Sequence, residues 1–320
     1  MATIAVLGAG AIGQFYGVQF LRAGHDLRFC ARRDATRLAR EGVRGSQTLT
    51  SQVTGTRDTT SLDEPAARFT VVTEPVQLRA THDPDWLLVA AKLSDLADVA
   101  AQVRAAAGPA TRIVVLGNGL GAEEALARAD LDPARIFGML CFVCVNREAD
   151  GRVLHLAHGQ VAVGHLADEV AERGALAALC RGAGIKTSEC AALREARWRK
   201  LVWNVPYNGL CTAHDCATDR IVHEPALAAR ARRLMDEVIA TANADLAAHG
   251  RSERIPPAWA EEQVRRTAEM GPYLPSTTLD RRAGQRLETD LIFAEPWRRA
   301  QRLGVDTPEL AALVKTLETL

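Results

Sequence analysis

The sequence has no long hydrophobic run and no excess of charge of either sign. Its 320 residues carry 39 basic and 39 acidic side chains, so the formal net charge is zero. This balance argues against nucleic acids and anionic membranes as general partners. No apolar stretch reaches the roughly 18 residues of a membrane span. The chain also opens directly on an apolar strand rather than on a signal peptide, so we expect a cytoplasmic protein.

Cysteine is limited to seven residues, an odd number, and most of them lie in apolar runs, which fits a reducing compartment. Cys141 and Cys144 have the spacing of a redox pair, but a three-residue step along a strand turns two side chains to opposite faces. We therefore interpret both as core residues. Residues 211–216 combine cysteine, histidine and aspartate but have no partner cluster elsewhere, so we expect no metal site.

Lysine is rarer still, since only four of the 39 basic residues are lysines. In such an arginine-rich background, each lysine is a candidate for a role that needs a compact ammonium able to lose its proton. These lysines are Lys92, Lys186, Lys200 and Lys315.

What the chain does have is an informative N-terminal segment. Apolar residues 3–7 lead into the glycine string Gly8-Ala9-Gly10-Ala11-Ile12-Gly13, an amphipathic stretch follows, and a second apolar run ends at residue 31. The order strand, glycine turn, helix, strand is typical of a dinucleotide-binding unit. Its glycines permit a tight turn, close approach of the backbone to a pyrophosphate, and close packing of helix on strand. The N-terminus of the helix offers free N–H groups to phosphate.

The end of the second apolar run distinguishes two nicotinamide cofactors. Proteins that bind NAD usually place an acid about 20 residues beyond the glycines, where it bonds the ribose hydroxyls. Here Arg32 and Arg33 occupy that window, and guanidiniums suit a 2′-phosphate by bidentate pairing. Asp34 lies slightly late but within reach of a ribose, and arginines that merely face solvent are the alternative. We predict NADP(H) rather than NAD(H).

Apolar runs alternate with helical spacing up to about residue 190, and the rest of the chain has a helical pattern. The alternation is typical of a doubly wound parallel sheet. The sequence therefore predicts an α/β Rossmann-type domain over residues 1–190, followed by an all-α domain over residues 191–320.

Four details of this assignment are specific enough to test. We expect a hairpin of residues 153–157 and 160–164, and a loop or short antiparallel strands over residues 42–65. Residues 281–303 are expected to form one helix. Pro206 should kink or end early the helix that starts at Arg194.

Lys200, Asn204 and Asn208 lie four residues apart, so they share one face of that helix. Each lies about 6 Å further along the axis than the one before it. Their neighbours are apolar, and a polar stripe in such a setting is unusual for a surface helix. Burial would lower the pKa of a lysine and let it donate a proton near neutral pH, while two amides would orient a small polar ligand. A solvated stripe or a seam of hydrogen bonds between helices is the alternative.

Taken together, these segments resemble the ketopantoate reductase (2-dehydropantoate 2-reductase) family. The resemblance runs in order over nearly the whole chain. It rests on the glycine string, Lys92 at a strand end, the Asn118-Gly119 turn, the helix with Lys200, Asn204 and Asn208, and the C-terminal segment with Ser276, Gly284 and Glu288.

The resemblance implies the NADPH-dependent reduction of 2-dehydropantoate, a 2-keto acid, in pantothenate and coenzyme A biosynthesis. Lys200 would be the general acid that protonates the ketone oxygen. Glu288 would help to place the substrate and balance the charge of the lysine. Asn204 and Asn208 would bond the hydroxyl and carbonyl ends of the substrate, and Ser276 its carboxylate side.

The resemblance also implies roles in cofactor binding. Residues 8–13 would hold the pyrophosphate, and Arg32 falls where the family places its 2′-phosphate arginine. Lys92 and Asn118 would lie near the nicotinamide and the substrate entrance.

Other readings stay open at this stage. Thr218 stands where some members of the family have a substrate asparagine, so a paralogue acting on another branched 2-keto or 2-hydroxy acid is an alternative. A non-catalytic NADP(H)-binding sensor on the same fold is a second. A homodimer is compatible with the sequence, which does not fix the oligomeric state.

Overall fold

The apolar runs of the first two thirds of the chain form one ten-stranded sheet in the computed structural model, which describes residues 1–50 and 57–320. The strand order is β4-β3-β9-β8-β7-β6-β1-β2-β5, and β10 pairs with β9. The strands are β1 (Thr3–Leu7), β2 (Asp26–Cys30), β3 (Gly45–Thr50), β4 (Arg57–Ser61), β5 (Thr70–Val72), β6 (Trp86–Val89), β7 (Arg112–Val115), β8 (Ile136–Arg147), β9 (Val153–His165) and β10 (Thr187–Glu189).

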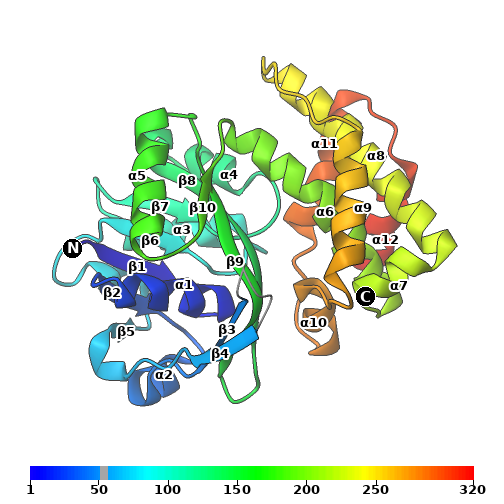
Figure 1. The fold of residues 1–320 in the computed structure, drawn as a ribbon. Coiled ribbons are helices and arrows are strands. Elements are labelled where there is room, and N and C mark those ends of the chain that lie inside the picture. The colour runs from blue at the N-terminus through cyan, green and yellow to red at the C-terminus, as the bar shows by residue number, and fades with distance from the viewer. Residues whose placement is uncertain (51–56) are drawn as a thin grey trace. The chain divides into compact units, whose positions relative to one another are not determined.

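The middle of the sheet is parallel and buried on both faces. One face packs against α1 (Ala11–Arg22) and α5 (Val170–Gly182), which share a hydrophobic core with residues such as Val6 and Leu88 (Figure 1). The alternate residues of the same strands, such as Leu87, are also fully buried, as expected for a parallel sheet covered on both sides. The remaining helices of this region are α2 (Ala35–Glu41), α3 (Leu96–Ala106), α4 (Ala122–Arg128), η1 (Ala66–Arg68), η2 (Pro75–Arg79) and η3 (Pro133–Arg135).

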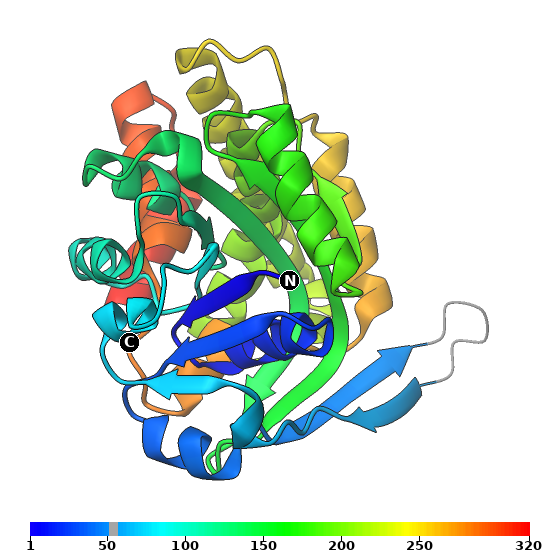
Figure 2. The same cartoon turned by 90° about the vertical axis from the view of Figure 1, so that its left-hand side faces the viewer.

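Two strand predictions have different outcomes. The expected hairpin of residues 153–157 and 160–164 is wrong, because both runs belong to β9, which pairs along its length with β8 in antiparallel fashion. His158 and Gly159, both with positive φ, form a bulge in this strand instead of a turn, and the register shifts there. Within residues 42–65, of which 51–56 lie outside the described residues, the antiparallel alternative is confirmed for β3 and β4, and Figure 2 shows these two strands at the edge of the sheet.

The chain divides into two compact units. The first comprises residues 1–117 and 122–193, and the second comprises residues 118–121 and 194–320. The second unit is helical, so the predicted fold class is confirmed. Its elements are α6 (Leu193–His214), α7 (Thr218–His223), α8 (Pro225–Ala248), α9 (Ala258–Met270), α10 (Ser276–Arg282), the π-helical turn η4 (Asp290–Ala294), α11 (Glu295–Leu303) and α12 (Pro308–Glu318).

The core of the second unit forms around α6. Trp198, Val202 and Leu210 of this helix are fully buried with apolar residues of α8, η4 and α12. At Gly209 a side chain would lie 2.5 Å from Leu313 Cδ2 and 3.0 Å from Phe293 Cε1, so the glycine permits the close approach of these neighbours. In the described part of the chain, no helix combines the length and apolarity needed to cross a membrane.

Two helix predictions in the second unit are corrected. Of the two alternatives for Pro206, the early end is wrong, because the α6 helix continues through the proline to His214, with a buried apolar face on both sides of it. The kink stays a prediction. The expected helix over residues 281–303 is wrong. After α10, Gly284 adopts φ +61°, which ends the helix, and residues 285–289 are not helical before η4 begins.

Candidate active site

The turn after β1 has room for a ligand at one of its three glycines. Gly8 has φ +101°, and a Cβ there would lie 2.5 Å from the backbone nitrogen of Ala91. A Cβ on Gly13 would lie 2.2 Å from the carbonyl oxygen of Gly8, so the helix packs directly on the turn. A Cβ on Gly10 would meet nothing within 4 Å. This open backbone, directly before the N-terminus of α1, fits a dinucleotide pyrophosphate.

Gln14, which the sequence analysis did not single out, holds this turn from within α1. Its side chain is fully buried, and Nε2 donates to the carbonyl oxygen of Ala9 at 2.7 Å. The glycine turn is therefore fixed by a side chain one turn into the helix.

Arg32 and Lys92 follow the two strands that flank β1. The last residue of β1, Leu7, pairs with Cys30 of β2 and with Val89 of β6, so the three strands end level. Both cations are exposed at this carboxyl edge. Open α/β sheets bind their ligands at such an edge, where the strand order changes direction. The structure therefore brings the glycine turn, Arg32 and Lys92 to the same edge of the first unit.

In the second unit, α6 presents the lysine and asparagines on a largely buried helix face. Asn204 and Asn208 are each 4% exposed, and Lys200 is half-buried. The apolar neighbours named above fill the other side of the helix. Pro206, between the two asparagines, lacks the N–H that would bond the carbonyl of Val202.

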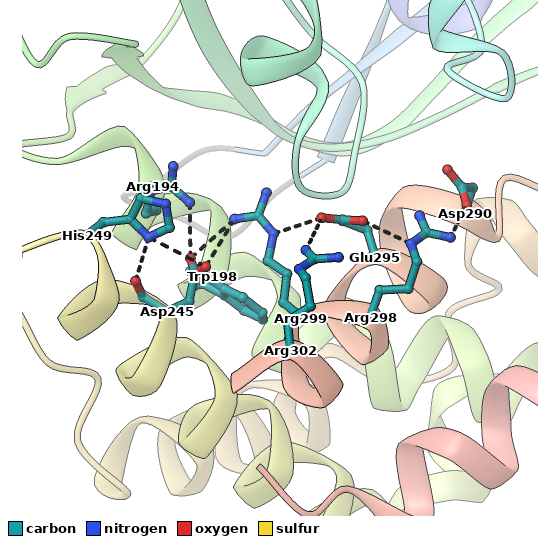
Figure 3. A network of polar contacts seen from close by, with 9 residues as sticks. All are labelled: Arg194, Trp198, Asp245, His249, Asp290, Glu295, Arg298, Arg299 and Arg302. Carbon is teal, nitrogen blue, oxygen red and sulfur yellow. Dashed lines mark hydrogen bonds and ion pairs between the residues drawn. The ribbon is translucent and has the colours of Figure 1, made fainter. Parts of the chain in front are cut away.

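A network of ion pairs links α6, α8 and α11 (Figure 3). The carboxylate of Asp245 in α8 accepts the indole N–H of Trp198 at 2.8 Å and the guanidinium groups of Arg194 at 3.1 Å and Arg299 at 3.2 Å. Burial alone would raise the pKa of Asp245, but the Trp198 hydrogen bond and the two positive charges outweigh it and lower the pKa. Arg299 Nε in turn donates to Glu295 at 2.9 Å. Asp245 thus ties the start of α6 to α11.

The same network reaches the segment that carries Glu288. Arg298 donates from Nε to Glu295 at 3.0 Å and from Nη1 to Asp290 at 2.9 Å. Arg302 adds a third guanidinium to Glu295 at 3.1 Å. Asp290 is the first residue of η4 and lies two positions after Glu288. The segment that follows Glu288 is therefore anchored to α11.

The π-helical turn η4 brings Asn118 into the second unit. Ala294 N–H bonds Thr289 O and Glu295 N–H bonds Asp290 O, both in the i to i−5 pattern of a π-helix. The bond after these, to Leu291 O, would need an N–H on Pro296. The proline has none, so the carbonyl of Leu291 accepts the N–H of Leu120 at 3.0 Å.

Gly119 makes this contact possible. It has φ +102°, and a Cβ there would lie 2.5 Å from Leu291 Cβ. Residues 118–121 therefore dock on the turn that follows Glu288. This contact joins two candidate site residues, Asn118 and Glu288, that lie 170 positions apart in sequence.

Ser276 is the first residue of α10 and is exposed. The helix is attached to the end of α6, because Thr278 Oγ1 lies 3.1 Å from Thr212 Oγ1 and Arg281 bonds the carbonyl of Thr212. Thr212 lies one turn beyond Asn208, so Ser276 belongs at the C-terminal end of the lysine–asparagine helix. This attachment depends on the side chains of Thr278 and Arg281 and leaves no periodic signal in the sequence.

Thr218 forms hydrogen bonds with the backbone of the segment before α10. Its hydroxyl donates to Gly271 O at 3.1 Å and accepts the N–H of Tyr273 at 3.1 Å, and its own N–H donates to Tyr273 O at 2.9 Å. The residue thus secures the segment that leads into Ser276. Among the described residues, no group of three or more metal-ligating side chains is found, the segment 211–216 included.

Comparison with known proteins identifies a family for each part of the chain. The sequence matches the family described as "Ketopantoate reductase PanE/ApbA" over residues 4–168 and its C-terminal counterpart over residues 192–320. It is 30% identical to a 2-dehydropantoate 2-reductase from Nostoc sp. over 327 aligned residues, which cover 99% of this chain and 94% of that protein.

Solved structures give the same result. The crystal structure of 2-dehydropantoate 2-reductase from Geobacter metallireducens has a TM-score of 0.87 and 32% identity, with 99% of each chain covered. A ketopantoate reductase from Staphylococcus aureus that is described as dimeric has the same fold, with a TM-score of 0.73, 18% identity, and coverage of 99% and 98%. The chain therefore belongs to the ketopantoate reductase family of NADP-dependent oxidoreductases.

Proposed function

We propose that this protein reduces 2-dehydropantoate to pantoate with NADPH, a step of pantothenate and coenzyme A biosynthesis. The observation that carries the proposal is the polar set of the second unit. Lys200, Asn204 and Asn208 share one face of α6. The hydrogen bond from Leu120 N–H to Leu291 O joins the segment of Asn118 to the segment that follows Glu288. The Nostoc relative, which aligns with 99% of this chain, is named for this reaction.

The cofactor would be held by the first unit. The pyrophosphate would lie against the open backbone at Gly10 and the N-terminus of α1, with the 2′-phosphate near Arg32. Lys92 would lie near the nicotinamide. When bound, NADPH supplies the hydride that the reduction requires.

The second unit would orient the substrate and provide the proton. Lys200 Nζ would donate its proton to the ketone oxygen, which becomes the new hydroxyl, and would recover a proton from solvent. Asn204 and Asn208 would hold the hydroxyl and carbonyl ends of the substrate, and Ser276 its carboxylate side. Glu288 would bind the substrate hydroxyl and balance the charge of Lys200.

A cytoplasmic location and a homodimer complete the proposal. The odd number of cysteines, six of them buried, supports a reducing compartment. The dimeric fold relative supports a dimer of this chain, which light scattering on the purified protein would measure directly.

The test is steady-state oxidation of NADPH by the purified protein with a panel of 2-keto acids. We expect 2-dehydropantoate to have the highest kcat/KM of the panel. A higher value for another 2-keto acid would replace the proposed substrate. Absence of turnover with every member, while NADPH still binds, would replace the enzyme by a cofactor-binding sensor.

A further inference from the structure

Asp34, the one acid close behind Arg32 and Arg33, is clamped by two other arginines. Arg37 donates to it twice, from Nε to Oδ1 at 2.9 Å and from Nη2 to Oδ2 at 2.6 Å. Arg147, at the end of β8, approaches Oδ2 with Nη2 at 3.1 Å. The Asp34 side chain is only 12% exposed in this cluster.

The Asp34 carboxylate does not cap the helix that it precedes. Asp34 is the N-cap residue of α2, where an aspartate ordinarily accepts a backbone N–H of the first turn. Its side chain makes no such bond, although the backbone there leaves donors available. Both carboxylate oxygens face guanidinium groups instead.

The turn between β8 and β9 packs against the Arg37 side chain of this cluster. Gly151 has φ +87°, and a Cβ there would lie 2.4 Å from Arg37 Nε and 2.6 Å from its Cζ. The backbone therefore lies directly on the guanidinium. Arg37 Nη1 is buried and has no hydrogen-bond partner in the described part of the chain. Hydrogen bonding to Asp34 raises the pKa of Arg37, so the cation is permanent.

This arrangement alters the electrostatics of the candidate ribose site. An unpaired acid behind β2 would accept the 2′-hydroxyl of NADH and repel the 2′-phosphate of NADPH. Here the guanidinium groups of Arg37 and Arg147 pair with the Asp34 carboxylate, and their two positive charges exceed its single negative charge. Arg32 and Arg33 remain exposed beside it.

We propose that the Arg37–Asp34–Arg147 cluster determines cofactor specificity, because it withholds the Asp34 carboxylate from the ribose and neutralises it next to the 2′-phosphate. Arg37 and Arg147 act through Asp34 and are positioning residues, whereas Arg32 is the candidate phosphate ligand. The inference rests on the proposed use of NADP(H) at this edge of the sheet, but not on the identity of the 2-keto acid.

The experiment measures the dissociation constants of NADPH and NADH by calorimetry, without substrate. Arg147→Gln removes one of the two positive charges that face Asp34, so the formal charge of the cluster falls from +1 to zero. The loss of one positive charge near the phosphate should weaken NADPH binding about tenfold. NADH binding should stay unchanged or tighten. Arg37→Gln should shift the ratio of the two constants in the same direction.

A second substitution separates the two possible actions of the arginines. If the arginines act through Asp34, adding Asp34→Asn to Arg147→Gln removes the negative charge of Asp34. The double variant should then bind NADPH to within about twofold of the original protein. If the double variant binds NADPH as weakly as Arg147→Gln alone, Arg147 is a direct phosphate ligand and the proposal is wrong. An unchanged ratio in both single variants would also overturn it.

The matched control is Arg152→Gln. Arg152 lies in the same turn and pairs with Glu148 and Asp150, but it makes no contact with Asp34. The ratio of the dissociation constants should not change in this variant. Because binding is measured without turnover, a different preferred 2-keto acid would leave this test intact. Loss of NADPH binding in the original protein would instead contradict the proposed function.

Discussion

Each unit of this protein contains an aspartate held by two arginines, and the two sites differ in what surrounds the carboxylate. Asp34 follows a strand at the carboxyl edge of the parallel sheet and is 12% exposed. Asp245 lies within a 24-residue helix, is 4% exposed, and also accepts an indole N–H. The same ion-pair chemistry can adjust charge at a surface where a ligand arrives or join helices inside a core. The surroundings, rather than the pair, decide which role dominates.

The comparison extends to the candidate sites themselves. In the first unit the ligand-facing elements are mostly backbone, a glycine turn and a helix N-terminus. In the second unit they are side chains on a helix braced by the Asp245 network. Substitutions in the first unit should therefore change cofactor affinity, and those in the second should change turnover or stability.

The largest expected effect is on turnover. Lys200→Ala removes the proposed proton donor and should lower kcat by about 10²–10⁴, the range typical of general acid catalysis. The dissociation constant of NADPH should stay the same, because the glycine turn and Arg32 belong to the first unit. Stopped-flow kinetics and calorimetry on the same preparation measure the two quantities.

Lys200→Arg is the matched variant. It keeps the positive charge, but a guanidinium does not release its proton near neutral pH. We expect this variant to be nearly as slow as Lys200→Ala. Activity close to that of the original protein would exclude Lys200 as the acid.

The next effect compares the two aspartates directly. Asp245→Asn removes the buried carboxylate that Arg194 and Arg299 share, which should lower the free energy of unfolding by about 3–5 kcal/mol. Asp34→Asn should lower it less, since its partners lie nearer to solvent. Urea unfolding followed by tryptophan fluorescence measures both. Equal losses would show that burial does not distinguish the two clusters.

The first unit was largely predictable because its signals are local. The glycine string fixes turn, helix start and packing within six residues. Gly8 and Gly13 each have a steric reason visible in the structure, whereas the space beside Gly10 is open. The misassigned hairpin in β9 shows the limit of such signals. His158 and Gly159 favour a turn, but pairing with β8 on either side keeps the chain extended around a bulge.

In the second unit, the helical pattern was predictable from the sequence, but the contacts between the helices were not. The period of Lys200, Asn204 and Asn208 identifies a face, but the ion pairs of Asp245 connect residues about 50 positions apart and follow no period. The segment around Glu288 was predicted as helix because its composition is helical. The left-handed Gly284 and the missing N–H of Pro296 override that pattern.

A smaller effect tests substrate recognition in the second unit. A site that pairs its polar groups with the primary hydroxyl of 2-dehydropantoate should discriminate against 3,3-dimethyl-2-oxobutanoate, which lacks that hydroxyl, by at least about tenfold in kcat/KM. Glu288→Gln keeps the shape but removes the charge, so it should reduce both the rate and this preference. Steady-state kinetics with both compounds provide the measurement. Equal rates in the original protein would point to a different 2-keto acid.

The smallest expected effect is a pH dependence of the Asp245 contribution. The folded protein lowers the pKa of this carboxyl group below its ordinary value. A lowered pKa means that the stabilisation is fully present above the ordinary aspartate range, near pH 4, and is lost as the pH falls through the lower folded value. The difference in unfolding free energy between the original protein and Asp245→Asn should therefore be constant from neutral pH to about pH 5 and shrink below about pH 4.

Urea unfolding of both proteins at a series of pH values measures this difference. Acids outside this network with lowered pKa values, such as Glu309, titrate in both proteins, so their effect largely cancels in the comparison. Asp34→Asn, measured in the same series, reports the corresponding contribution of the more exposed cluster. A difference for Asp245→Asn that stays constant or grows in acid would mean that Arg194, Arg299 and Trp198 do not favour the ionised carboxylate, and the contrast between the two aspartates would then have to rest on packing alone.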